Sequence, residues 1–196
     1  MLLQILDLLL DAAASFLGIA FLARFALQWA RAPFRNPIGQ FVVAVTDWAV
    51  RPARRVIPSA FGYDLPSLIL AWLVQGLRLG LVYGLTAGGH ASLTAFGPIA
   101  ALAVVEVAKL GCHLAFGVLL VSIILSWVNP YAPMAPLFDA LAAPMLRPFR
   151  RIVPPLGGVD LSPLGAFLVI QVLLIVLGYA QAALTRALYM PALMPF

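Results

Sequence analysis

The sequence predicts an all-α membrane protein with four transmembrane helices, arranged as two tandem helical hairpins of the same orientation. Three observations predict this fold: the composition, four long apolar stretches, and an arginine-rich motif that occurs twice. Of the 196 residues, 64% are hydrophobic and 10% are charged, and the mean hydropathy is +1.05. Soluble domains are about 45 to 50% apolar, so this chain has the composition of a protein that is solvated by a lipid bilayer.

Four stretches supply the ~20 apolar residues that a helix needs to cross the hydrocarbon core. They are Ile5 to Trp29, Leu65 to Leu85, Pro98 to Trp127 and Ser162 to Leu184. The first stretch is preceded by no basic segment, contains Asp7 and Asp11, and leads to no small-residue cleavage site. We therefore expect it to be a permanent helix and not a secretory signal.

The arginine-rich motif lies between the two apolar stretches of each hairpin. The sequence RPARRVIP, which begins at Arg51, returns 96 positions later as RPFRRIVP, which begins at Arg147. Asp64-Leu65 and Asp160-Leu161 keep the same offset, and each motif is preceded by an Asn-Pro pair. We interpret the chain as an internal duplication, with repeat 1 over residues 1–90 and repeat 2 over residues 91–196.

Each repeat is also expected to carry a short amphipathic helix between its two spans. In repeat 1, Asn36 can cap a helix whose first residue is Pro37, and the segment Ile38 to Val50 would extend only about 20 Å. Its apolar and charged residues fall on different sides, as in helices that lie in the membrane interface. Prolines, including Pro52, are expected to break these helices in both repeats, the first at Arg51.

The distribution of arginine predicts the topology. The two motif segments are basic, whereas the connection from Thr86 to Gly97 has no Lys or Arg. By the positive-inside rule both basic segments face the cytoplasm and both termini lie outside. Because two spans separate the segments, the repeats have the same orientation, unlike the inverted repeats of many transporters.

The motif arginines have two possible roles. The simpler one is topological anchoring. The other is contact with anionic lipid headgroups or an acidic partner surface, to which each arginine would add about 1 kcal/mol of attraction. The candidate contact residues are Arg51, Arg54, Arg55, Arg147, Arg150 and Arg151.

Two aspartates, Asp64 and Asp160, each precede a span just after the basic motif. A carboxylate at this position can cap the first turn of the helix and interact with its dipole. A salt bridge to the motif arginines is the alternative.

Ionisable residues inside the spans are costly unless they are paired or hydrated, and so they are functional candidates. We selected Asp11, Arg78, Glu106 and Lys109. We expect an inward-facing network that joins the hairpins, for example Arg78 with Glu106 and Asp11 with Lys109. The alternative is a route for ions or protons.

Several function classes find no support in the sequence. It contains no nucleophile with a base and an orienting group and no glycine-rich phosphate loop, so we expect no enzyme. Its single cysteine, Cys112, excludes an internal disulfide and a CxxC metal site. We expect no cofactor or metal site and, because the arginines cluster in two loops without an aromatic platform, no nucleic-acid partner.

At this level of detail the chain resembles a known family. The segment NPIGQFVV from Asn36 leading to RRVIP, and PMLRPFRR from Pro144 leading to GGVDLSP, resemble the two halves of YggT family membrane proteins. The order Pro66-Ser67, where repeat 2 has Ser162-Pro163, departs from that pattern. The resemblance implies a bacterial inner-membrane protein. It implies plastid relatives that take part in cytochrome b6 haem attachment, and bacterial relatives associated with envelope organisation, division or osmotic tolerance.

Two functional hypotheses follow. The preferred one is a non-enzymatic scaffold or assembly factor that binds a membrane-protein partner or anionic lipid through its cytoplasmic arginines. The alternative is a subunit of a small ion channel or transporter, as a homo-oligomer because four spans enclose little space.

Overall fold

Six α-helices form the regular structure of the described part of the chain. The computed structural model describes residues 1–32, 36–57, 63–86, 95–152 and 160–189. The helices are α1 (Leu2–Trp29), α2 (Pro37–Val56), α3 (Leu65–Thr86), α4 (Phe96–Val128), α5 (Ala135–Ile152) and α6 (Ser162–Tyr189).

Four of these helices, α1, α3, α4 and α6, are long and apolar enough to cross a membrane. The shortest, α3, has 22 residues, which corresponds to about 33 Å of helix and exceeds the ~30 Å hydrocarbon core. The expectation of four spans is thus confirmed by helix length and composition. The spans extend slightly beyond their predicted limits, most clearly in α6, which ends at Tyr189 and not at Leu184.

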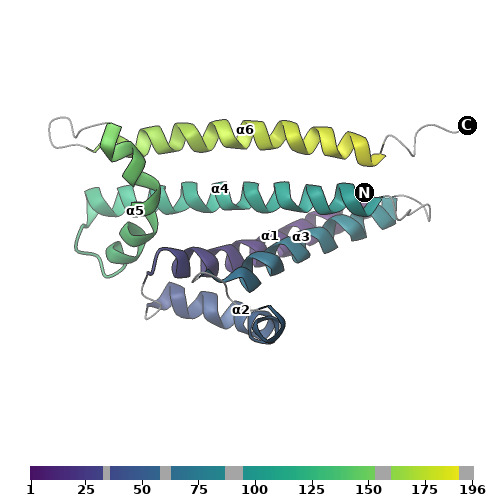
Figure 1. Ribbon diagram of the computed structural model, residues 1–196, viewed down its shortest axis with the longest axis horizontal. Coiled ribbons are helices and arrows are strands. Elements are labelled where there is room, and N and C mark those ends of the chain that lie inside the picture. Colours follow the sequence, from purple (N-terminus) through teal and green to yellow (C-terminus); the bar gives the residue numbers. More distant parts are fainter. Residues whose placement is uncertain (33–35, 58–62, 87–94, 153–159, 190–196) are drawn as a thin grey trace, which may run out of the picture.

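The long helices lie alongside one another, with α4 between α6 and the pair formed by α1 and α3 (Figure 1). The two shorter helices, α2 and α5, lie at the same end of the long helices (Figure 1). There α2 packs on α1 and α3, and α5 packs on α4 and α6. Both arginine-rich segments are therefore at one end of the molecule.

Buried contacts join the two halves of the chain. One apolar cluster contains Leu27 of α1 together with Leu119, Leu137 and Ile170 from the C-terminal half. At Gly18 the helices approach so closely that an added Cβ atom would lie 2.8 Å from Cδ1 of Leu110. A side chain at that position would require the Leu110 side chain to move.

The prolines inside α2 and α5 do not end these helices. We expected a break at Arg51, but α2 continues through Pro52 to Val56, and α5 likewise contains Pro144 and Pro148. In Figure 1 the last part of α2 is seen along its axis while its first part lies across the view, so the helix bends. A proline removes one main-chain hydrogen bond and displaces one carbonyl, and such a loss bends a helix whose neighbouring turns remain bonded. At the start of α2, the Asn36 side chain accepts a hydrogen bond from the Gly39 amide at 2.8 Å, which confirms the expected cap.

An unusual residue occupies the C-terminal end of α1. The Ala32 amide donates to the carbonyl of Leu27 at 2.9 Å and the Arg31 amide to that of Gln28 at 3.1 Å, the pattern of a Schellman motif. Arg31 takes the left-handed position, with φ of 51°, which is usually glycine. A non-glycine residue in this conformation costs about 1–2 kcal/mol, and the exposed Arg31 side chain gains no burial there.

Candidate functional site

A buried arginine, Arg24, organises the junction between α1, α2 and the start of α3. It lies in α1 with 7% of its surface exposed. Its guanidinium group donates to Oδ1 of Asp47 at 2.7 Å and to the Thr46 hydroxyl at 2.8 Å. Its Nε atom lies 3.4 Å from Oδ2 of Asp64. One buried cation therefore ties α1 to α2 and to the start of α3.

Asp64 is the second member of this junction and is fully buried. Its carboxylate accepts a hydrogen bond from Nη2 of Arg54 at 2.9 Å and from the Ser67 hydroxyl at 2.8 Å, besides its contact with Arg24. The Ser67 amide bonds to the main-chain carbonyl of Asp64 at 3.1 Å. Of the two roles that we considered for this carboxylate, its contacts thus correspond to the salt bridge.

The second half of the chain contains a more exposed ion pair at the positions equivalent to Arg54 and Asp64. Nε of Arg150 lies 2.9 Å from Oδ2 of Asp160, whose side chain is 39% exposed. Asp160 also accepts a hydrogen bond from the Ser162 amide at 2.9 Å, at the start of α6. Burial raises the pKa of Asp160, but the hydrogen bonds from Ser162 and Arg150 outweigh that effect, so its pKa lies below the usual value.

The two halves of the chain differ at the position of the buried arginine. When Trp29 is aligned with Trp127, Ser122 occupies the position in the second half that is equivalent to Arg24. The Ser122 hydroxyl lies 2.9 Å from Oδ1 of Asp139 in α5. A neutral hydrogen-bond donor therefore joins α4 to α5 in the second half, where a cation joins α1 to α2 in the first half.

These contacts divide the six candidate contact arginines into two groups. Arg51, Arg54 and Arg150 are paired with Asp47, Asp64 and Asp160, respectively. The side chains of Arg55, Arg147 and Arg151 are exposed, and no described carboxylate pairs with them. Because a paired guanidinium is partly neutralised, the unpaired group has more capacity to bind an external anion.

The four ionisable residues selected in the spans meet around one pocket of about 360 Å³. Arg78 of α3 is paired with Asp11 of α1. Nζ of Lys109 lies 3.6 Å from Oε2 of Glu106 in the same helix. The side chain of Gln181, in α6, accepts a hydrogen bond from Lys109 at 2.7 Å and donates one to Glu106 at 2.6 Å.

The pairing differs from the example that we gave from the sequence. We expected Arg78 to pair with Glu106 and Asp11 with Lys109. In the structure Arg78 pairs with Asp11, and Lys109 pairs with Glu106. The reason is packing, because α1 lies against α3 while Glu106 and Lys109 are one helical turn apart on α4. The amide of Gln181 then connects the α4 pair to α6. Both halves of the chain line the pocket, but each of these described pairs lies within one half, so they do not join the hairpins as we expected.

Two residues of these sites were missed in the sequence. Arg24 lies five positions before Trp29, and its charge within an apolar run was the signal that should have placed it among the intramembrane candidates. Gln181 carries no charge, and little in the sequence distinguishes it from a polar residue near the end of a span.

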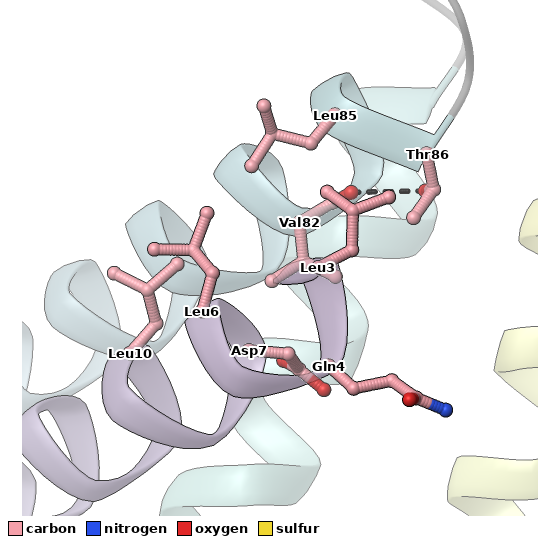
Figure 2. A pocket seen from close by; sticks show the side chains of 8 residues that line it. All are labelled: Leu3, Gln4, Leu6, Asp7, Leu10, Val82, Leu85 and Thr86. Atoms are coloured by element: carbon pink, nitrogen blue, oxygen red, sulfur yellow. Dashed lines mark hydrogen bonds between the residues drawn. The ribbon is translucent and has the colours of Figure 1, made fainter. Parts of the chain in front are cut away.

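A smaller pocket at the other end of the long helices is lined by few polar or charged side chains. It lies between the first turns of α1 and the last turns of α3, and its lining is mainly leucine side chains, with Gln4 and Asp7 at one side (Figure 2). The Thr86 hydroxyl there donates to the carbonyl of Val82 in its own helix at 2.9 Å. We therefore place the candidate site in the two charged clusters.

The low pKa of Asp47 predicts an acid-sensitive contribution to stability. The hydrogen bond from Arg24 is the largest cause, and the pKa lies below the ordinary value of 3.8. The contribution is present above pH 3.8 and is lost as the pH falls through the folded-state pKa. We expect Asp47→Asn to lower the free energy of unfolding by about 1 kcal/mol at pH 7, and the difference from wild type to shrink below about pH 4. Unfolding of the detergent-solubilised protein at both pH values tests this, and a difference that does not change with pH would contradict it. Asp7→Asn, at an exposed residue, is the control.

Fold and site together define a multi-pass helical membrane protein whose spans are tied by ion pairs. Comparison with known proteins assigns it further. The sequence pattern of the CCB3/YggT family matches residues 3–85 and 100–181, and the chain belongs to this family. The resemblance found in the sequence is thus confirmed.

Two bacterial relatives cover most of the chain, and a plant relative covers a shorter part. An uncharacterised protein of Pseudomonas aeruginosa is 40% identical over 157 residues, which cover 78% of this chain and 77% of that protein. The uncharacterised protein YggT of Escherichia coli K12 is 35% identical over 90% of this chain and 89% of its own length. The chloroplastic YlmG homolog protein 2 of Arabidopsis thaliana is 49% identical over 57 residues, 28% of this chain and 22% of the plant protein. No solved structure matches the chain.

Proposed function

We propose that this protein is a non-enzymatic scaffold or assembly factor of the bacterial inner membrane, which binds a membrane-protein partner or anionic lipid through arginines on the cytoplasmic side. The observation that carries the proposal is the position of Arg55, Arg147 and Arg151 at the end of the spans where α2 and α5 lie, exposed and without an ion pair among the described residues. Cations in such a position attract an acidic surface.

The ion pairs near α2 and α5 support this proposal because they fix the short helices against the long ones. Arg24 and Asp64 hold α2 against the spans, and the Arg150 and Asp160 pair is placed in the same way beside α5 and α6. The order of a span, a short helix and a second span occurs twice, and the equivalent Arg and Asp residues are paired in both halves. We infer a tandem duplication in which each copy presents one amphipathic helix to the cytoplasmic interface, with both termini outside.

Removal of the unpaired arginines tests the scaffold function. We expect the double variant Arg55→Gln/Arg151→Gln to retain at least tenfold less of a co-purifying partner or of surface anionic lipid, because each lost cation removes about 1 kcal/mol of attraction. Native mass spectrometry of protein extracted gently from its membrane measures both. Arg186→Gln removes an exposed cation near the other end of α6 and is the control. Unchanged retention in the double variant would contradict the proposal.

A channel or transporter subunit is the second candidate, and the charged pocket around Glu106 and Lys109 is the observation that favours it. A conducting route would require these side chains to exchange partners with a passing ion. Their pairing with each other and with Gln181 supports instead a role in holding α4 against α6. Ion flux through proteoliposomes that contain the purified protein discriminates between the two candidates.

A further inference from the structure

A second basic site lies between the two halves of the chain, at the end where α1 meets α5. It is a pocket of about 470 Å³ whose lining includes Trp29 and Arg31 from the end of α1, and Ala143, Pro144 and Arg147 from α5. This volume lies within the range of pockets that hold small ligands. Arg31 belongs to none of the sites described above.

The charge of this pocket is uncompensated within the described part of the chain. Both arginines are exposed, and no carboxylate is among the lining residues. Asp47 is paired with Arg24 and Arg51. Asp139 accepts a hydrogen bond from the Ser122 hydroxyl of α4 and is not among the lining residues of the pocket. Two guanidinium groups that share a pocket without a counter-ion favour an anion with several oxygen atoms, and phosphate oxygens suit their geometry.

The depth of the pocket indicates where the anion comes from. Trp29 is the last residue of the spanning helix α1, and 42% of its surface is exposed. Tryptophan side chains at the ends of spans lie at the level of lipid headgroups. The small apolar residues Ala143 and Pro144 also line the pocket. The pocket therefore combines basic side chains, which suit a negatively charged phosphate, with apolar surface, which suits the acyl chains of a phospholipid.

The main chain of Arg31 is a further indication. Its left-handed conformation is one that glycine would adopt without strain. Strained residues of this kind are often found at binding sites, where the side chain is needed despite the main-chain cost. Here the strained position directs an arginine to the pocket that Arg147 also lines.

We propose that this pocket binds the phosphate group of an anionic phospholipid, with Arg31 and Arg147 as its ligands and Trp29 beside them. The proposal rests on the proposed placement of this end of the spans at the cytoplasmic leaflet, and it adds a defined site and a ligand class. One lipid would then bridge the two halves of the chain, because one arginine comes from each half.

Titration of the purified full-length protein with defined lipids, followed by native mass spectrometry, tests the proposal. We expect the first phosphatidylglycerol to bind more tightly than phosphatidylcholine, and diacylglycerol, which lacks phosphate, not to bind at this site. Arg31→Gly and Arg147→Gln should each weaken the first phosphatidylglycerol about tenfold or more, the change expected for the loss of a charge-assisted hydrogen bond. Arg31→Gly relieves the main-chain strain, so its thermal unfolding temperature should rise while its affinity falls.

The matched control is Arg186→Gln, at an exposed residue outside the pocket, which should alter the affinity of the first phosphatidylglycerol less than about twofold. If Arg55→Gln/Arg151→Gln weakens the first lipid and the pocket variants do not, the pocket proposal is overturned while the proposed function stands. If the pocket variants alone weaken it, the pocket stands even where the partner role fails. Displacement of the lipid by inorganic phosphate at equal concentration, or loss of a co-purifying protein without a change in lipid affinity, would also overturn the assignment to a lipid.

Discussion

Replacement of Asp64 by alanine is expected to lower the free energy of unfolding by about 3–5 kcal/mol, the cost of removing one partner from a buried ion pair. Asp64 is fully buried and is shared by Arg24 and Arg54. Arg24 is 7% exposed and would keep Asp47 as its remaining carboxylate partner. The fully buried Ser67 hydroxyl would lose the acceptor of its hydrogen bond. Chemical or thermal unfolding of the detergent-solubilised protein, followed by far-UV circular dichroism, measures the change.

Asp160→Ala is the matched control, because Asp160 occupies the equivalent position in the second half. Its side chain is 39% exposed and its partner Arg150 is 54% exposed, and exposed pairs contribute less than about 1 kcal/mol. Loss of its hydrogen bond to the Ser162 amide removes a helix cap and adds about 1 kcal/mol. Asp64→Ala should therefore be destabilised by at least about 1 kcal/mol more than Asp160→Ala. Equal effects would show that the buried arginine does not set the stability of this junction.

The four spans could be predicted well from the sequence because bilayer thickness imposes a length and a composition on each helix. The ends of α3 and α4 agree with the expected limits to within two residues, since apolar runs end abruptly there. The bent but continuous form of α2 could not be predicted with equal success. Whether a proline ends or bends a helix depends on packing around the neighbouring turns, and that packing involves α1 and α3.

The pairing of the charged residues likewise depends on packing that the sequence does not reveal. That Asp11, Arg78, Glu106 and Lys109 would be functional candidates followed from the cost of charge in a membrane. Which cation binds which anion depends on the order in which the spans pack, and a hydropathy pattern does not contain that order. Arg24 was overlooked for a different reason, because it lies close enough to Trp29 for an arginine to reach the interface, whereas the structure turns it inward to Asp47 and Asp64.

Glu106→Leu is expected to destabilise the protein by about 3 kcal/mol, somewhat less than the loss of a partner from a fully buried pair. Lys109 would keep only Gln181 as a described partner, and its side chain is 25% exposed, which allows partial relief. The double variant Glu106→Leu/Lys109→Leu removes both charges and should recover most of this loss, because replacing a buried pair with apolar residues is often neutral. Unfolding of the wild type, both single variants and the double variant forms a double-mutant cycle, in which a coupling energy near zero would contradict a structural role for the pair.

The same four proteins distinguish the two candidate functions. A polar route for ions depends on these charges, so a transport subunit should lose flux in the double variant even though that variant folds. A scaffold should keep its partner or lipid in the double variant, because the arginines near α2 and α5 are unchanged. Proteoliposome flux and native mass spectrometry on one preparation therefore separate the hypotheses. Retained stability with lost flux would favour transport, whereas retained stability with retained binding and unchanged flux would favour the scaffold, because in that case the pocket charges would serve only to hold neighbouring helices together.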